Sequence, residues 1–388
     1  MNHMKIVAFY LPQFHNIPEN NEWWGDGFTE WSNVKSASPI YEGHHQPKVP
    51  LDNNYYNLLD DNVKIWQANI AKEHGIYGFC YYHYWFNGRL ILEKPMEQML
   101  ANPDIDIPFC VCWANEAWTK SWTGKKTVLL PQTYGDSSDW KKHFDYLLPF
   151  FRDPRYIKED EKPLIVIYRP KVMDCVTEMM SLWNDLAIEA GFPGLKLMCL
   201  TDNLLLEDTK VYDSFESIIE WQPNAAKFNN KSSQNPVIAS LKSFRRSFFS
   251  KMEQLTGIDL RNWDPAAKML GKSLQFISYD SVWEQILNIQ PSSSKSIPGA
   301  FIRWDNTPRF HEKGSVIIGE NPVKFYNYMK QQIVHARNDY KSDMIFFYAW
   351  NEWAEGGYLE PDTEYGYDYL IALKKALMDT GELPVRTL

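Results

Sequence analysis

The stretch DMIFFYAWNEWAEGGYLEPD, residues 343–362, joins an unbroken apolar run to a polar turn. The run lacks the alternation of apolar and polar residues that a half-exposed strand shows, so it predicts a parallel strand buried on both faces. The turn beyond it carries two acids three residues apart, Glu352 and Glu355, followed at once by Gly356 and Gly357. The stretch therefore predicts a strand whose carboxyl end delivers a pair of carboxylates.

Apolar runs of the same kind recur along the chain before this one. They are KIVAFYLPQ (5–13), GIYGFCYYHYWF (75–86), IPFCVCWANE (107–116), KPLIVIYRP (162–170), LKLMCLTD (195–202), SIIEWQP (217–223) and GAFIRWDNTP (299–308). Helix-like stretches lie between most of them, at 62–75, 137–153, 172–191 and 322–339. Eight strands that alternate with helices predict an α/β fold, a (β/α)8 TIM barrel, as a single catalytic domain over residues 1–388.

Two intervals depart from this regular spacing. Residues 14–61 form a long loop after the first strand, and residues 224–298 form a helical excursion after the sixth, with helices expected near 236–256 and 281–289. Both follow strands, so both should rise from the carboxyl face of the barrel, where active sites of this fold are built. An open doubly wound sheet is the alternative architecture, but the sequence contains neither a GxGxxG nor a GxxxxGK[ST] phosphate loop.

The composition limits the kinds of molecule that the chain is expected to bind. A net charge of −9 argues against nucleic acid and anionic membrane surfaces as partners. The sequence contains no run of about 18 apolar residues, so we expect no membrane-spanning segment. Aromatic residues make up 15% of the chain, above the usual share. Their ring faces match the C–H faces of sugars, which indicates a carbohydrate substrate. No acid and histidine cluster has metal-ligand spacing, so we expect no metal and no cofactor.

The cysteines and the N-terminal residues bear on the compartment. Five cysteines lie in or near apolar strand-like runs, and this odd count indicates free thiols in a reducing environment. A strand-like run begins at Lys5 with no basic and apolar leader before it. Both observations predict a cytoplasmic protein, while the oligomeric state stays open.

Polar and aromatic side chains gather where the predicted strands end. In a barrel these positions project into the active site. Carboxylates, amides and aromatic rings dominate the set, which suits hydrogen bonds to hydroxyls and stacking on sugar faces. The candidate substrate-binding residues are Tyr10, Trp24, Trp31, His83, Tyr84, Trp113, Asn115, Glu116, Trp118, Asp202, Glu220, Trp304, Asp305, Asn351 and Trp353.

The two glutamates of the last turn are the candidate catalytic residues. If residues 351–356 take a helical turn, the Cβ atoms of Glu352 and Glu355 lie about 5–6 Å apart, near the roughly 5–5.5 Å between carboxyl groups in retaining glycosidases. Their mutual repulsion favours one protonated and one ionised acid, which acetal cleavage needs. Two alternatives stay open. One glutamate caps a helix while the other faces solvent, or Glu116, after the third strand, is the true acid.

Four segments resemble the WbsX-type proteins. They are residues 9–50, FCVCWANEAWTKSWTG (109–124), RWDNTPR (303–309) and WNEWAEGGYLEPDTEYGYDYL (350–370). That group is often named glycosyltransferase or lipopolysaccharide biosynthesis protein, and it is related to glycoside hydrolase family 99, the endo-α-mannosidases and endo-α-mannanases. The resemblance spans nearly the whole chain and implies a (β/α)8 barrel that acts on glycans.

Family 99 enzymes carry a NEW-x-EG motif in which both glutamates are catalytic, and Glu352 and Glu355 match it. The resemblance implies Glu352 as the base on the sugar 2-hydroxyl, which attacks the anomeric carbon to give an epoxide-like intermediate. It implies Glu355 as general acid to the leaving oxygen and then as base to water. Ala354 stands where family 99 usually has histidine, and GGYLEP replaces a GTQIEP-like run. These departures leave the identity of the sugar open.

Three functions are compatible with these features. The first is a retaining, endo-acting glycoside hydrolase on a polysaccharide or oligosaccharide, α-mannoside-like by family analogy. The alternative is a sugar-nucleotide-dependent glycosyltransferase of lipopolysaccharide or surface polysaccharide assembly, although the DxD-type segment Asp104–Asp106 precedes a strand instead of following one. The third is a glycan-binding protein without turnover.

Overall fold

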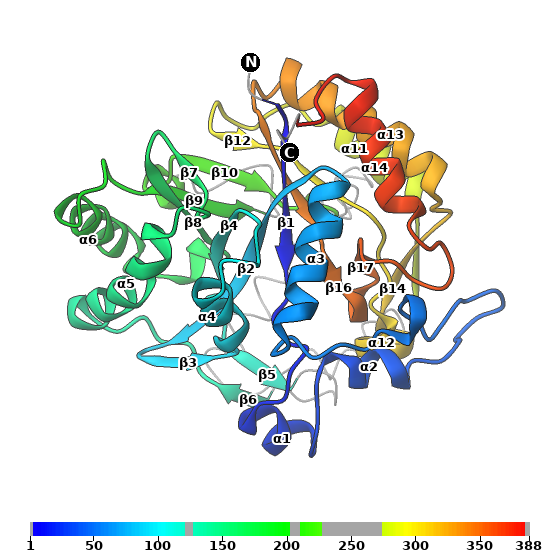
Figure 1. The fold of residues 1–388 in the computed structure, drawn as a ribbon, viewed down its shortest axis with the longest axis horizontal. Helices are drawn as coiled ribbons and strands as arrows, with labels where there is room; N and C mark the ends of the chain where they lie inside the picture. Colours follow the sequence, from blue (N-terminus) through cyan, green and yellow to red (C-terminus); the bar gives the residue numbers. More distant parts are fainter. Residues whose placement is uncertain (1–2, 121–126, 202–209, 227–273, 385–388) are drawn as a thin grey trace, which may run out of the picture.

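The computed structural model describes residues 3–120, 127–201, 210–226 and 274–384, and parallel strands occupy its centre (Figure 1). The main strands are β1 (Lys5–Tyr10), β2 (Ile76–Phe86), β4 (Phe109–Trp113), β8 (Lys162–Ile167), β9 (Lys196–Thr201), β10 (Ser217–Glu220), β12 (Ser296–Ile297), β13 (Gly299–Phe301) and β15 (Met344–Tyr348). Within these described ranges they pair in the order β12-β10-β9-β8-β4-β2-β1-β15-β13, with all pairs parallel.

The barrel closes through a seventh strand that is split in two. Its first piece, β12, pairs with β10, and its second piece, β13, pairs with β15. Only Pro298 lies between the two pieces, and proline has no N–H to give to a sheet ladder. Counted as one, these pieces complete eight strands in the described part of the chain, so the predicted (β/α)8 barrel is confirmed.

The strands owe their positions to the apolar runs that encode them. All five residues of β15 are buried, as are the last five of β1, β8 and β9. Except for β2, each strand ends before its predicted run does: β15 stops at Tyr348, whereas the run continues to Glu352. The polar residues at the ends of the runs therefore lie in the connections that follow the carboxyl ends of the strands.

Several of the outer helices begin at side-chain caps. Asp60, Asp136 and Asn321 each accept a hydrogen bond from a backbone N–H in the first turn. The helices around the barrel are α3 (Asp61–Glu73), α4 (Lys94–Ala101), α5 (Ser137–Arg152), α6 (Val176–Glu189), α11 (Tyr279–Asn288), α13 (Pro322–Asn338) and α14 (Asp368–Asp379). Figure 1 shows α5 and α6 packed together on one side and α11, α13 and α14 on the other.

Short elements fill the connections. The short helices are α1 (Pro18–Trp24), α2 (Glu30–Ser36), α7 (Lys210–Asp213), α12 (Thr307–Phe310), and the 3₁₀ turns η1 (Leu51–Asn53), η2 (Pro170–Val172), η4 (His311–Lys313) and η5 (Trp353–Glu355). The short strands are β3 (Arg89–Ile91), β5 (Trp118–Lys120), β6 (Thr127–Leu130), β7 (Lys158–Glu159), β11 (Gln275–Ser278), β14 (Ser315–Ile318), β16 (Asn351–Glu352) and β17 (Gly357–Tyr358).

The two long intervals differ in what the structure describes. The interval after β1 contains α1 and α2, which lie with β5, β6 and α12 at the end of the barrel where β1 terminates (Figure 1). In the interval after β10, α11 occupies the position expected for the second helix, and the helix expected near 236–256 lies outside the described residues. The first interval thus supplies segments that surround the carboxyl ends of the strands.

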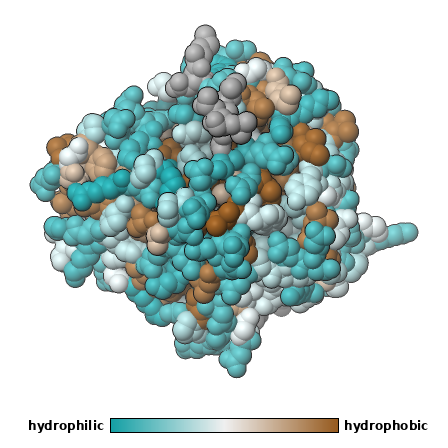
Figure 2. Space-filling model, in the orientation of Figure 1, coloured by the Kyte–Doolittle hydropathy of each residue, from teal (hydrophilic) through white to brown (hydrophobic). Residues whose placement is uncertain are grey.

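The surface seen in Figure 2 is mostly hydrophilic, and hydrophobic residues are scattered over it in small groups. None of the described helices has both the length and the apolar character that crossing a bilayer requires. The large apolar side chains lie inside, in one continuous cluster that joins the barrel to its helices.

Candidate active site

A cavity of about 320 Å³ opens at the carboxyl ends of the strands. Aromatic rings supply much of its wall, and they come from elements far apart in the sequence: Trp24 and Phe28 from the first interval, Tyr82 from β2, and Tyr168 after β8. Its volume is at the lower end of the usual range for small-molecule sites. The cavity lies where active sites of this fold are expected.

The two glutamates of the last turn both line this cavity. Asn351–Glu352 (β16) pairs antiparallel with Gly357–Tyr358 (β17), and η5 bridges them. Glu352 is the N-cap of η5, with a non-helical backbone (φ −81°, ψ 65°), and Glu355 is the last residue of the turn. Both side chains line the cavity, which brings the two acids of the last turn to one site.

The Gly-Gly pair makes this tight turn possible. Gly356 has a φ of +66°, and a Cβ there would come within 2.8 Å of the backbone N of Asp305. Gly357 lies against the Tyr348 ring, where a Cβ would come within 2.4 Å of a ring carbon. The Asp305 N–H donates to the Glu355 carbonyl at 2.8 Å. The two glycines therefore let the turn pack directly against Asp305 and Tyr348, and this packing fixes the position of the two acids.

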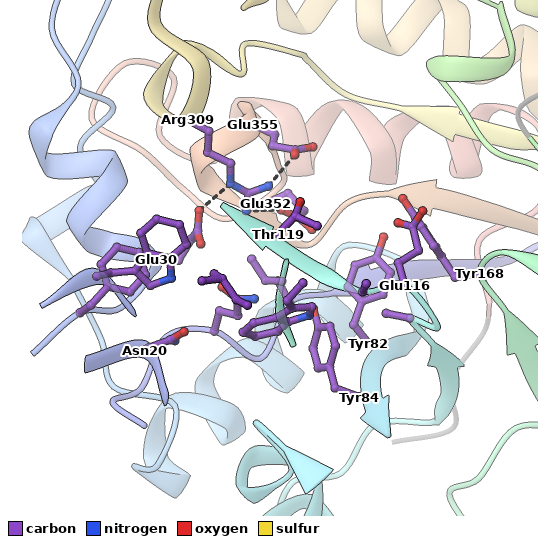
Figure 3. A pocket seen from close by; sticks show the side chains of 18 of the residues that line it. Asn20, Glu30, Tyr82, Tyr84, Glu116, Thr119, Tyr168, Arg309, Glu352 and Glu355 are labelled. Atoms are coloured by element: carbon purple, nitrogen blue, oxygen red, sulfur yellow. Dashed lines mark hydrogen bonds and ion pairs between the residues drawn. The ribbon is translucent and has the colours of Figure 1, made fainter. Parts of the chain in front are cut away.

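A single arginine connects the two acids. Arg309 Nη1 lies 2.5 Å from Glu355 Oε1, and its Nη2 lies 3.4 Å from Glu352 Oε2. Its Nε donates to Glu30 Oε1 at 2.8 Å, so the first interval also contributes a carboxylate (Figure 3). The Glu30 side chain is 2% exposed and that of Arg309 is 16% exposed. One partly buried guanidinium thus forms ion pairs with three carboxylates, those of Glu30, Glu352 and Glu355.

Burial and charge set the protonation of the pair. Desolvation by burial raises the pKa of Glu352 to about 8, against the lowering effect of the Arg309 charge and with a further rise from the charge on Glu355. Glu355 accepts hydrogen bonds from Arg309 and from the Tyr348 hydroxyl. Burial therefore favours the protonated form of Glu352.

Four candidate substrate-binding residues line the same cavity: Trp24, Tyr84, Glu116 and Trp118. Glu116 forms an ion pair with Arg169 at 3.0 Å, and its side chain is 48% exposed. Figure 3 shows Glu116 on the side of the cavity opposite Glu30. Glu116 thus lines the wall of the cavity and is paired with Arg169, whereas Glu352 and Glu355 are paired with Arg309.

The other described candidates lie outside this cavity and are held by protein groups. Some support the turn that carries Glu352 and Glu355: Asn351 binds the backbone of Leu11 with both its amide atoms, at 2.7 and 3.0 Å, and Trp353 stacks on Tyr358 and donates to Glu360. Asp202 lies outside the described residues. The remaining residues found in packing or in other hydrogen-bond networks are Tyr10, Trp31, His83, Trp113, Asn115, Glu220, Trp304 and Asp305.

The model of one protein family, described as glycosyltransferase WbsX, matches residues 6–373. The chain belongs to the WbsX family. A relative named uncharacterized protein WxcX, from Xanthomonas campestris pv. campestris, is 33% identical over 376 residues. That match covers 96% of this chain and 49% of the relative, so the chain spans about half the length of the curated relative.

Solved structures of similar fold are glycoside hydrolases by name. The GH99 endo-α-mannosidase from Bacteroides thetaiotaomicron aligns over 99% of both chains with a TM-score of 0.57 and 13% identity. A glycoside hydrolase-like protein aligns over 97% of this chain and 94% of its own, with a TM-score of 0.54 and 12% identity. At these identities the likeness establishes the fold of this WbsX family member. The predicted relation of the family to glycoside hydrolase family 99 is confirmed at that level.

Three residues of the hydrogen-bond cluster around the two acids, Arg309, Glu30 and Tyr348, were missed in the sequence. Arg309 stands in the RWDNTPR segment that carries the family resemblance, yet its partners Glu30 and Glu355 are distant in sequence. Tyr348, the last residue of β15, lines the cavity and donates to Glu355. The place of this arginine in the RWDNTPR segment was the available signal. Nothing in its spacing pointed to the acids it would meet.

Metal ligation has no candidate in the part of the chain that is described, where no three His, Cys, Asp or Glu side chains are placed to share an ion. The charged groups of the cavity are instead paired through Arg309 and Arg169. The chemistry that these residues offer is proton transfer by carboxylates.

The Glu352→Gln variant should gain thermal stability relative to the wild type as the pH rises. A native pKa of about 8, above the ordinary 4.5, means that the native state binds more protons than the unfolded state between these values. The stability contributed by protonated Glu352 is thus full below pH 4.5 and is lost as pH rises through 8. Glutamine does not titrate. The gap in Tm should therefore widen by roughly 5 °C or more between pH 5 and pH 9, measured by scanning calorimetry, and a constant gap would contradict the burial argument.

Proposed function

We propose that this WbsX family member is a retaining glycoside hydrolase whose catalytic pair is Glu352 and Glu355. The observation that carries the proposal is that both acids of one turn reach a single guanidinium in an aromatic-walled cavity. Acetal cleavage requires a proton donor and a proton acceptor close together. Aromatic rings offer apolar faces for sugars. The fold shared with an endo-α-mannosidase supports a glycan substrate.

The roles follow the family resemblance. Glu352 removes the proton of the sugar 2-hydroxyl, whose oxygen attacks the anomeric carbon, while Glu355 gives its proton to the departing glycosidic oxygen. Water then attacks the anomeric carbon as Glu355 takes its proton, and Glu352 returns a proton to the 2-oxygen. Each step inverts the anomeric centre, so the overall configuration is retained. No bond to the protein forms in this scheme.

The scheme requires the proton of the pair to be on Glu355 when the substrate is bound. Burial by itself favours a proton on Glu352, because it raises the pKa of this residue to about 8. Both acids contact the same guanidinium, so moving one proton from Glu352 to Glu355 leaves the net charge of the cluster unchanged. We therefore place this transfer at substrate binding, when hydroxyls replace part of the polar environment of the pair.

The test is hydrolysis by the wild-type chain of a panel of α-mannans and related oligosaccharides. We expect new reducing ends from internal cleavage and, by proton NMR during the first minutes, a product of the same anomeric configuration as the substrate. Release of the inverted anomer would contradict the two-step scheme. Failure to cleave any member of a broad polysaccharide library would contradict hydrolysis itself.

A glycosyltransferase is the second candidate because the family model carries that description. The DxD-type segment Asp104–Asp106 precedes β4, at the end of the strand opposite the cavity, and Asp106 is paired with Lys72 at 2.5 Å. It is thus not placed to hold a sugar nucleotide in this cavity. Calorimetric titration with nucleotide-diphosphate sugars distinguishes the two candidates, and micromolar binding would favour the transferase.

A further inference from the structure

A second cavity, of about 370 Å³, lies behind the catalytic turn, and we call it the Arg303 cavity. It is bounded by the loop around His44, by Arg303–Asp305 after β13, by residues 316–320 and by Tyr365. Gly356 lines this cavity whereas Glu355 lines the catalytic one, and the hydrogen bond from Asp305 N to Glu355 O lies between them. The two cavities are therefore separate sites on either side of one turn.

The guanidinium of Arg303 is buried in this cavity with donors to spare. Its side chain is 5% exposed, and Nη2 donates to Asp362 at 2.9 Å. Rings of Tyr358, Tyr365 and Tyr369 lie 4.4–5.4 Å from its Cζ and cover it with apolar faces. Its Nε and Nη1 have no hydrogen-bond partner among the described residues. Leaving such donors unsatisfied costs about 1–3 kcal/mol each, so acceptors from outside the chain are favoured here.

A carboxyl, that of Glu320, lines the same cavity. The Glu320 carboxylate takes no hydrogen bond from the side chain of another described residue, and burial raises its pKa. The other charged groups neutralise one another: Lys48 and His45 pair with Glu364 at 2.6 and 2.7 Å, and His44 lies 2.8 Å from Asp305. What the cavity has left to offer is two N–H groups of Arg303 that have no partner among the described residues, together with the Glu320 carboxyl.

This combination decides the chemistry of the ligand. An anion would satisfy Arg303 but would face Glu320, and a cation would meet the reverse conflict. Adjacent hydroxyls satisfy both, because each hydroxyl accepts one hydrogen bond and donates another. The partly exposed ring of Tyr365 adds an apolar face. We infer that the Arg303 cavity is a second carbohydrate-binding site, which holds a neutral sugar unit by its vicinal hydroxyls between Arg303 and Glu320.

Affinity electrophoresis in gels that contain a neutral polysaccharide tests this site. The parent is the Glu352→Gln chain, so that binding is read without cleavage, and the polymers are mannan, dextran and xylan, with dextran sulfate as the anionic comparison. We expect Glu320→Ala in this background to weaken retardation by the preferred neutral polymer about tenfold, which is the loss of one to two good hydrogen bonds. The matched control is Glu312→Ala, an exposed glutamate on η4 outside the cavity, which should migrate like the parent.

The outcomes separate this inference from the proposed hydrolase. Retardation that depends on Glu320 supports the second site even if the wild-type chain cleaves nothing. Three results would overturn it: equal retardation of parent and Glu320→Ala, no retardation by any of the three neutral polymers, or a Glu320-independent response to dextran sulfate alone. The first would mean that ordered water satisfies Arg303. Arg303→Gln, checked for folding by circular dichroism, provides the second variant and should lose retardation in parallel.

Discussion

The Glu355→Gln variant should cleave an unactivated glycan about 10³-fold more slowly than the wild type. A positioned general acid contributes roughly 10²–10⁴ to such a reaction, and glutamine cannot give a proton to the leaving oxygen. An aryl glycoside with a good leaving group needs no such proton, so the rate of its hydrolysis should fall only about tenfold in this variant. The alkaline limb of its kcat/KM profile should also disappear, because that limb reports the ionisation of the acid.

The controls for this experiment come from the same cavity. Glu352→Gln should lose activity on both the unactivated glycan and the aryl glycoside, because the 2-hydroxyl must be activated whichever group leaves. Glu116→Gln removes a carboxylate that lines the wall and pairs with Arg169, and its loss should be far smaller. If Glu116→Gln proved the more damaging change, or if its activity were rescued by the good leaving group, Glu116 would be the acid and the role of Glu355 would be wrong.

The Arg309→Met variant should lose about 100-fold in kcat/KM at pH 7 and should move the acid limb of the profile to higher pH. The positive charge of Arg309 lowers the pKa of Glu352 against the larger effect of burial. Without that charge Glu352 holds its proton more tightly, and each unit of pKa reduces the ionised fraction about tenfold. The measurement is the pH dependence of kcat/KM between pH 5 and pH 10.

Two companion variants distinguish charge from loss of structure. Arg309→Lys keeps the positive charge but lacks the guanidinium group that reaches three carboxylates. The acid limb of its kcat/KM profile should therefore shift less than that of Arg309→Met. Arg309→Met with Glu30→Gln removes one carboxylate together with the guanidinium, which relieves the excess negative charge of the single variant. An acid limb that stays in place in Arg309→Met would show that the arginine does not set the protonation of Glu352.

The barrel was readable from the sequence because its strands are buried on both faces. Runs such as KPLIVIYRP contain β-branched and aliphatic residues without interruption, and each became a strand whose residues are nearly all buried. The split of the seventh strand at Pro298 was not anticipated, because the predicted run began at Gly299 and left β12 out. A two-residue strand has no periodicity to detect.

Glu352 and Glu355 are three residues apart in the sequence, and the structure places both at the wall of one cavity, whereas their role as a catalytic pair stays a prediction. The surroundings of the two acids could not be read from the sequence. Arg309 meets Glu30 across 279 positions, and such a contact depends on the whole barrel closing. Residue type misled in the other direction. Trp31 and Trp353 were expected to face sugar, but each packs on other rings, among them one another at 5.3 Å.

The bonds between Asn351 and Leu11 join the last connection of the barrel to the first. Because Glu30 also reaches Arg309 from that first connection, the head and tail of the chain must meet before the pair of acids is properly oriented. A nascent or partly folded copy therefore has no assembled reaction centre. If the proposed hydrolase activity is measured, it will therefore also indicate that the barrel has closed.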